Sequence, residues 1–116
     1  MGMPNGLLAV ASMGSRGLDD EVSQVFARCP VFTIVQFERE GIRNVKIEVN
    51  RAAKLPHGVG PMVSYRLIDM GVVAVIAGGF GPTVLEILKR SNVEAITVPA
   101  GTVIREAVER YLKQQE

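Results

Sequence analysis

The sequence is poor in the residues that build common metal and catalytic sites. Among 116 residues there is one cysteine, Cys29, and one histidine, His57. One cysteine cannot form an internal disulfide, nor can it supply the thiolates of a closed zinc or iron–sulfur site within one chain. No Ser–His–Asp or Cys–His pair can be assembled with support from the sequence. These shortages argue against a tightly ligated metal and against an enzyme.

An excess of one charge and a long apolar run are also missing. Lys and Arg total 13 and Asp and Glu total 12, so no long-range field draws in nucleic acid or anionic lipid. Residues 72–77, like the other apolar runs, are too short to cross a bilayer, and the first residues lack the pattern of a signal peptide. We therefore expect a cytoplasmic protein without nucleic-acid or membrane partners, and the oligomeric state stays open.

Length and apolar content predict one domain, which we place at residues 7–116 after a flexible leader at 1–6. Apolar runs and β-branched stretches predict strands at residues 7–13, 31–37, 42–49, 72–77 and 94–98. Helical spacing and end signals predict helices at residues 61–70 and 82–91, a last helix capped by Thr102, and a short helical turn at 19–27. The alternation of strands and helices indicates an α/β fold.

The rules of connection arrange these strands in one mixed sheet of order 3-2-1-4-5, with only the second strand antiparallel. This topology is that of the ribonuclease H-like motif. Nucleases with that motif hold two metal ions through carboxylates on central strands, but residues 7–13 contain no acid. Nuclease chemistry is therefore not expected.

Glycine-rich loops at residues 13–17, 51–60, 78–81 and 99–101 should meet where four of the strands end. Glycine lets a ligand approach the backbone, and helices that begin there direct free N–H groups at an anion. Ligands of open α/β sheets bind at this edge, here between the first and fourth strands. The alternative is that the glycines only form turns. The candidate binding glycines are Gly58, Gly60, Gly78, Gly79, Gly81 and Gly101.

Few side chains in these loops can add specific chemistry. His57 could ligate a soft or borderline metal, and the alternative is a solvated loop histidine. Arg16 could bind an oxyanion or a sulfide-rich anion, and the alternative is again a solvated side chain. We expect Met13 to pack in the core, and the alternative is a thioether contact with a soft metal. Cys29 precedes Pro30 at the start of a strand, so we expect a structural thiol at the opposite edge of the sheet, and the alternative is a ligand role.

Several motifs in this order resemble the dinitrogenase iron-molybdenum cofactor biosynthesis family, which includes NifX-like proteins and the C-terminal part of NifB-like proteins. The resemblance covers nearly the whole chain from Leu7. It is carried by residues 7–11, 17–19, 25–32, 57–60, 71–82 and 101–103. The chain departs from the family pattern where the usual Phe-Gly-Arg is Phe26-Ala27-Arg28, and where Val25 replaces a frequent histidine.

The resemblance implies a three-layer α/β/α, ribonuclease H-like fold and noncovalent handling of iron-molybdenum cofactor or its precursors. Relatives of this kind include a protein that carries a molybdenum-copper-sulfur cluster. We therefore expect a non-catalytic carrier of a molybdenum- or iron–sulfur-type cluster that is not tightly held, with cofactor-assembly proteins as partners. The alternative is a regulatory module that binds a small anion or a phosphorylated metabolite at the same edge.

Overall fold

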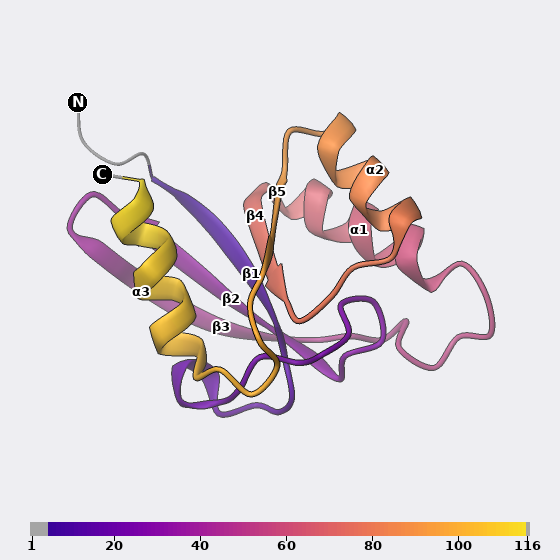
Figure 1. The fold of residues 1–116 in the computed structure, drawn as a ribbon, viewed down its shortest axis with the longest axis horizontal. Helices are drawn as coiled ribbons and strands as arrows, with labels where there is room; N and C mark the ends of the chain where they lie inside the picture. The colour runs from indigo at the N-terminus through magenta and orange to yellow at the C-terminus, as the bar shows by residue number, and fades with distance from the viewer. Residues whose placement is uncertain (1–4, 116) are drawn as a thin grey trace.

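A five-stranded mixed sheet lies between two helical layers in the computed structural model, which describes residues 5–115. Helices α1 and α2 cover one face of the sheet and α3 covers the other (Figure 1). The sheet order is β3-β2-β1-β4-β5 with β2 alone antiparallel, as predicted. The elements are β1 (Gly6–Ser12), the 3-10 helix η1 (Gly17–Asp19), β2 (Val31–Glu38), β3 (Gly41–Val49), α1 (Val59–Met70), β4 (Val72–Ala77), α2 (Pro82–Arg90), β5 (Glu94–Thr97) and α3 (Ile104–Gln114).

Strand β1 is the centre of both hydrophobic cores. Ala9 and Ala11 contact the core under α1 and α2, whereas Leu8 and Val10 contact the core under α3, and all four are fully buried. A strand that is buried on both faces has no solvent side on which to place polar residues. This explains the unbroken apolar run in the sequence.

Local sequence signals account for the end of α1 and the start of α2, but not for the start of α3. Helix α1 ends at Gly71, whose φ of 90° allows its N–H to bond to the carbonyls of Leu67 and Ile68. Pro82 occupies the first turn of α2, as predicted. The predicted cap of α3 is wrong: the Thr102 hydroxyl donates to the carbonyl of Pro99 at 2.6 Å, which closes the turn before the helix.

The helical turn predicted at residues 19–27 is also wrong beyond η1. Residues 20–24, which we call the edge segment, run in extended form across the ends of the strands, bridging Val22 to Ser12 and Glu21 to Val103. Ser23 donates its N–H to the carbonyl of Ala11 and accepts the N–H of Gly78, each at 2.8 Å. Tertiary hydrogen bonds therefore override the helical spacing of the apolar side chains.

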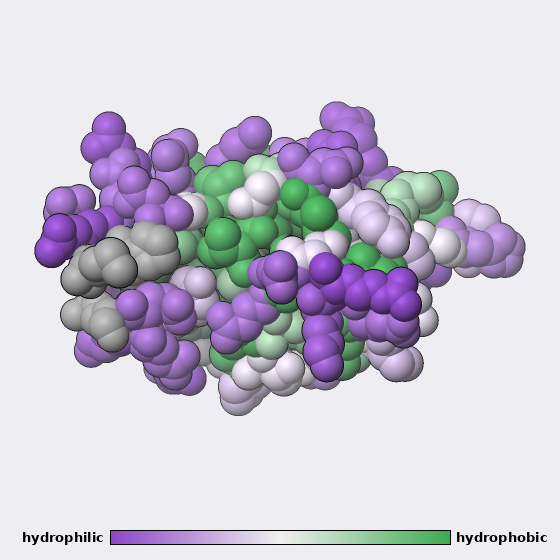
Figure 2. All heavy atoms as spheres, turned by 90° about the horizontal axis from the view of Figure 1, so that it is seen from above, coloured by the Kyte–Doolittle hydropathy of each residue, from purple (hydrophilic) through white to green (hydrophobic). Residues whose placement is uncertain are grey.

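The two ends of the sheet differ in character. Strands β1, β3, β4 and β5 end at what we call the loop edge, where the edge segment lies. Figure 2 views the molecule from the opposite end, where apolar surface at the centre is bordered by hydrophilic residues.

Gly6 pairs with Phe37, so β1 begins inside the predicted leader, of which residues 1–4 lie outside the described part. No helix within residues 5–115 is long and apolar enough to cross a membrane.

We expect Gly78→Ala to destabilise the protein by about 2 kcal/mol, because a side chain there overpacks the edge segment. A Cβ atom on Gly78 would lie 2.8 Å from the Cα atom and 3.0 Å from the carbonyl oxygen of Gln24, and backbone cannot easily yield. Gly81→Ala is the matched control, since nothing lies within 4 Å of its Cβ position and its φ is −73°. Urea unfolding measures both variants, and equal midpoints would contradict the predicted difference.

Candidate functional site

The predicted glycine loops lie at the loop edge, but the edge segment separates them. The N–H of Gly78 is bonded to Ser23, and the N–H of Gly101 is bonded to the carbonyl of Val22 at 2.9 Å. Both amides, which we expected to face a ligand between β1 and β4, are therefore engaged by the protein's own backbone. Any ligand at this edge must use other donors.

Arg16 is engaged as well. Its backbone N–H donates to Asp20 at 3.0 Å, and its guanidinium lies 3.5 Å from the same carboxylate. Burial alone would raise the pKa of Asp20, but hydrogen bonds from the N–H groups of Arg16 and Glu21, together with the Arg16 guanidinium, lower it below its ordinary value. The structure thus gives Arg16 an internal anionic partner.

His57 and its neighbouring glycines lie at the start of α1. His57 is exposed, and Gly58 caps α1 with a φ of 71° that favours glycine. A Cβ atom on Gly60 would lie 2.9 Å from Cγ2 of Val84, so this glycine lets α1 approach the first turn of α2. The first turns of the two helices are therefore neighbours.

Two of the predicted glycines, Gly79 and Gly81, line a pocket of about 370 Å³ beside the first turn of α2. The N–H groups of Thr83 and Val84 have no acceptor within the helix, because the first N–H groups of any α-helix lack one. Within residues 5–115, the N–H groups of Gly79, Phe80 and Gly81 also show no hydrogen bond. We call this the glycine-loop pocket, and its full lining is Gln24, Val25, Phe26, Ala27, Arg28, Gly79, Phe80, Gly81 and Val84.

Arg28 is the one charged residue of the glycine-loop pocket, and the search for candidate side chains in the sequence missed it. Its Nη1 donates to the carbonyls of Ala53 and Leu55 at 2.9 and 3.0 Å. No other hydrogen bond of this guanidinium is found in the described part of the chain, so Nε and Nη2 retain donors for a ligand. The only signal in the sequence was the position of Arg28 in the family-like motif.

Soft metal ligands are scarce at the loop edge. Cys29 lies at this edge and not at the opposite one as predicted, because antiparallel β2 begins where β1 ends and Val31 pairs with Ser12. The thiol is 1% exposed, and burial raises its pKa to about 12, so it stays protonated. Met13 is 57% exposed, contrary to the expected packing, because the chain leaves the sheet after Ser12.

The glycine-loop pocket combines backbone N–H groups that have no partner among the described residues with one positively charged side chain. Gly79, Gly81, Arg28 and the first turn of α2 line the same pocket, and the positive end of a helix and a guanidinium both favour an anion. The lining contains no Asp, Glu, His, Cys or Ser that could act as an acid, base or nucleophile. Across residues 5–115, no three His, Cys, Asp or Glu side chains gather closely enough to hold a metal ion.

Comparisons with known proteins find one matching family model and several similar proteins. Residues 7–114 match the family model of the dinitrogenase iron-molybdenum cofactor proteins. An uncharacterized protein of Methanocaldococcus jannaschii is 30% identical over 95 residues, which are 82% of this chain and 80% of the relative. The structure of a NifB-like protein of Thermotoga is 32% identical with a TM-score of 0.72, covering 95% of this chain and 90% of that one. The apo form of the orange protein of Desulfovibrio gigas is 26% identical with a TM-score of 0.82, covering 97% and 90%.

We expect Asp20→Asn to cost about 2 kcal/mol of stability at pH 7, because an amide cannot replace a carboxylate that accepts charged and backbone hydrogen bonds. The pKa of Asp20 is lowered in the folded state, so its contribution is complete well above 3.8 and is lost as the pH falls from there through the lowered value. Urea unfolding at pH 7 and pH 3 measures this, with the exposed Asp69→Asn as control. A stability difference from the wild type that does not shrink at pH 3 would contradict the assignment.

Proposed function

The chain belongs to the dinitrogenase iron-molybdenum cofactor family, and we propose that it carries a molybdenum- or iron–sulfur-type cluster, or a precursor of one, without catalysing a reaction. The cluster is a cargo that the protein holds and releases. The glycine-loop pocket is the holding site.

The observation that carries this proposal is the set of free donors at the start of α2. Sulfide and oxide groups of an anionic cluster accept hydrogen bonds from backbone N–H groups, and such concave sets of N–H groups are found at phosphate and iron–sulfur sites. Gly79 and Gly81 leave the backbone accessible, and Arg28 adds a fixed positive charge. These contacts need no bond to the metal itself.

Noncovalent binding also agrees with the supply of ligands. A closed metal site needs several thiolates or imidazoles, whereas this chain has one buried, protonated thiol and one exposed histidine. Release of a cluster held mainly by hydrogen bonds and charge requires the exchange of at most one protein ligand. This property suits a carrier, which must pass its cargo to a cofactor-assembly protein.

His57 is the residue that we propose contacts the metal when the cargo leaves a coordination position open. It lies on the loop that leads into α1, and the first turn of α1 packs against Val84 of the pocket. Arg28 ties the same loop to the pocket through the carbonyls of Ala53 and Leu55. Because His57 is exposed and does not line the pocket, it would contact only a cluster that extends beyond the pocket.

The second candidate function is a module that binds a small anion or a phosphorylated metabolite. It is favoured by the same helix N-terminus, because phosphate and sulfide-rich anions are recognised by the same N–H groups. The two functions differ in the need for His57, since a phosphate offers no metal to an imidazole.

Anaerobic titration with tetrathiomolybdate, with and without copper, tests the pocket. We expect stoichiometric binding, seen as charge-transfer absorbance that co-elutes with the protein. Gly81→Glu should weaken it at least about tenfold, because a carboxylate at the start of α2 competes for the N–H groups and repels the anion. Gly81→Gln is the matched control of nearly equal size and should bind within about threefold of the wild type.

Equal weakening by both substitutions would mean that space and not charge controls the pocket, and no effect of either would place the ligand elsewhere. His57→Ala separates the two candidate functions. We expect it to weaken the binding of the copper-containing cluster by more than about threefold. Inorganic phosphate that binds to the pocket regardless of His57, with no binding of thiomolybdate, would support the metabolite-binding module instead.

A further inference from the structure

A second pocket, of about 340 Å³, lies between α1, the end of β3 and the loop that follows it. Its rim carries three apolar side chains that are unusually open to solvent: Val49 is 55% exposed, Leu55 is 37% exposed and Met62 is 52% exposed. Exposed apolar side chains that surround a concave apolar floor mark sites of interaction. We call it the α1–β3 pocket, and its floor is formed by Phe32, Ala52, Val63 and Leu67.

The α1–β3 pocket carries more basic than acidic side chains, although the chain as a whole is nearly neutral. Arg51, Arg66 and the neighbouring Lys46 are basic, and Glu48 is the one acidic side chain in the lining. The single acid, Glu48, is already paired with Arg66 and lies 3.9 Å from Lys46. Arg51 at the rim has no carboxylate bonded to it among the described residues.

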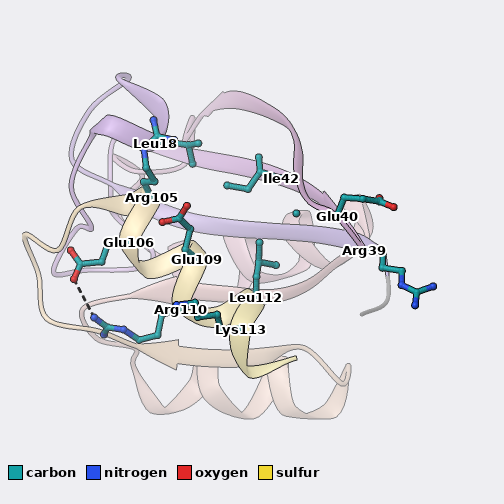
Figure 3. Close-up of a pocket in the computed structure, with 11 residues that line it drawn as sticks. Leu18, Arg39, Glu40, Ile42, Arg105, Glu106, Glu109, Arg110, Leu112 and Lys113 are labelled. Carbon is teal, nitrogen blue, oxygen red and sulfur yellow. Dashed lines mark hydrogen bonds and ion pairs between the residues drawn. The ribbon is translucent and has the colours of Figure 1, made fainter. Parts of the chain in front are cut away.

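The larger groove beside α3, of about 910 Å³, lacks this asymmetry. Figure 3 shows Arg110 paired with Glu106, and Arg105 is bonded to Asp19. Four basic and three acidic side chains line that groove, and the carboxylate of Asp19 beside Arg105 makes the charges equal, so the groove offers no net field that would select a charged partner. Charge thus distinguishes the smaller pocket from the larger one.

We propose that the α1–β3 pocket docks an acidic segment of a partner protein, which inserts one apolar side chain between α1 and β3. The volume lies at the lower limit of the ~300–1,000 Å³ that is usual for small-molecule sites, and much of the apolar rim would stay exposed around a small ligand. A partner segment would bury the floor of the pocket with its inserted apolar side chain, and its backbone would cover the apolar rim. Acidic residues beside that side chain then meet Arg51 and its basic neighbours.

Arg28 links this docking site to the glycine-loop pocket. Its guanidinium is bonded to the carbonyl of Leu55, a rim residue, while its side chain lines the other pocket. A partner that binds at the rim would therefore contact the loop to which Arg28 of the other pocket is bonded. The docking proposal stands on the pocket and its charge, and it does not depend on the identity of the cargo.

Selection of peptides from a random phage-displayed library on the intact protein tests the proposal. We expect enriched peptides to contain an apolar residue flanked by Asp or Glu, and to shift the NMR signals of Val49, Leu55 and Val63. Met62→Glu should weaken the selected peptides at least about tenfold, since it places a negative charge at the mouth of the pocket. Tyr65→Glu is the matched control, because Tyr65 is 54% exposed on the same helix and does not line the pocket. It should change binding by less than about twofold.

Three results would overturn the proposal. One is the absence of enriched acidic peptides, or enriched peptides that bind equally to both variants. Another is a concentration-dependent dimer in sedimentation that Met62→Glu abolishes, which would make a second copy the occupant. The third is saturable binding of decanoate in the pocket without any selected peptide, which would make it a site for small amphipathic ligands.

Discussion

The loop edge depends on the backbone hydrogen bonds of Val22 and Ser23. These two residues are bonded to the end of β1, to Gly78 after β4, and to the turn before α3, so one extended segment joins three loops that are distant in sequence. Each such bond contributes on the order of 1 kcal/mol net, but leaving the buried groups unpaired would cost more. This arrangement requires a glycine at position 78, because the backbone of Gln24 occupies the space that a side chain there would need.

The same segment decides where a ligand can bind. In an open α/β sheet the free space is expected beyond the ends of the central strands, but here the protein's own backbone occupies it and uses the amides of Gly78 and Gly101. The accessible donors are shifted sideways to the start of α2, where Arg28 lies. The edge thus keeps N–H groups that are unpaired within residues 5–115, but at residues 79–84 and not at Gly78 and Gly101.

The sheet was predictable because its determinants are local or follow from rules of connection: buried strands read as apolar runs, and right-handed crossovers leave one order of strands. The positions of Val22 and Arg28 were not predictable from the sequence. Their hydrogen-bond partners lie at residue 102 and at residues 53–55, and no sequence pattern indicates contacts between such distant residues. Cys29 was misplaced for another reason. Because β2 is antiparallel to β1, it begins at the loop edge where β1 ends. The predicted topology already implied this position, but the expectation for Cys29 disagreed with it.

Net charge is a poor guide to partners when charge is segregated. The near-neutral total of this chain excludes a field acting on the whole molecule, but within about 10 Å, the distance over which salt screens charge, only the neighbouring residues matter. Around the α1–β3 pocket those neighbours are mainly basic, and Glu48 is already bonded to Arg66. Because Arg28 joins the rim of this pocket to the glycine-loop pocket, a partner drawn in by that local charge would bind beside both pockets.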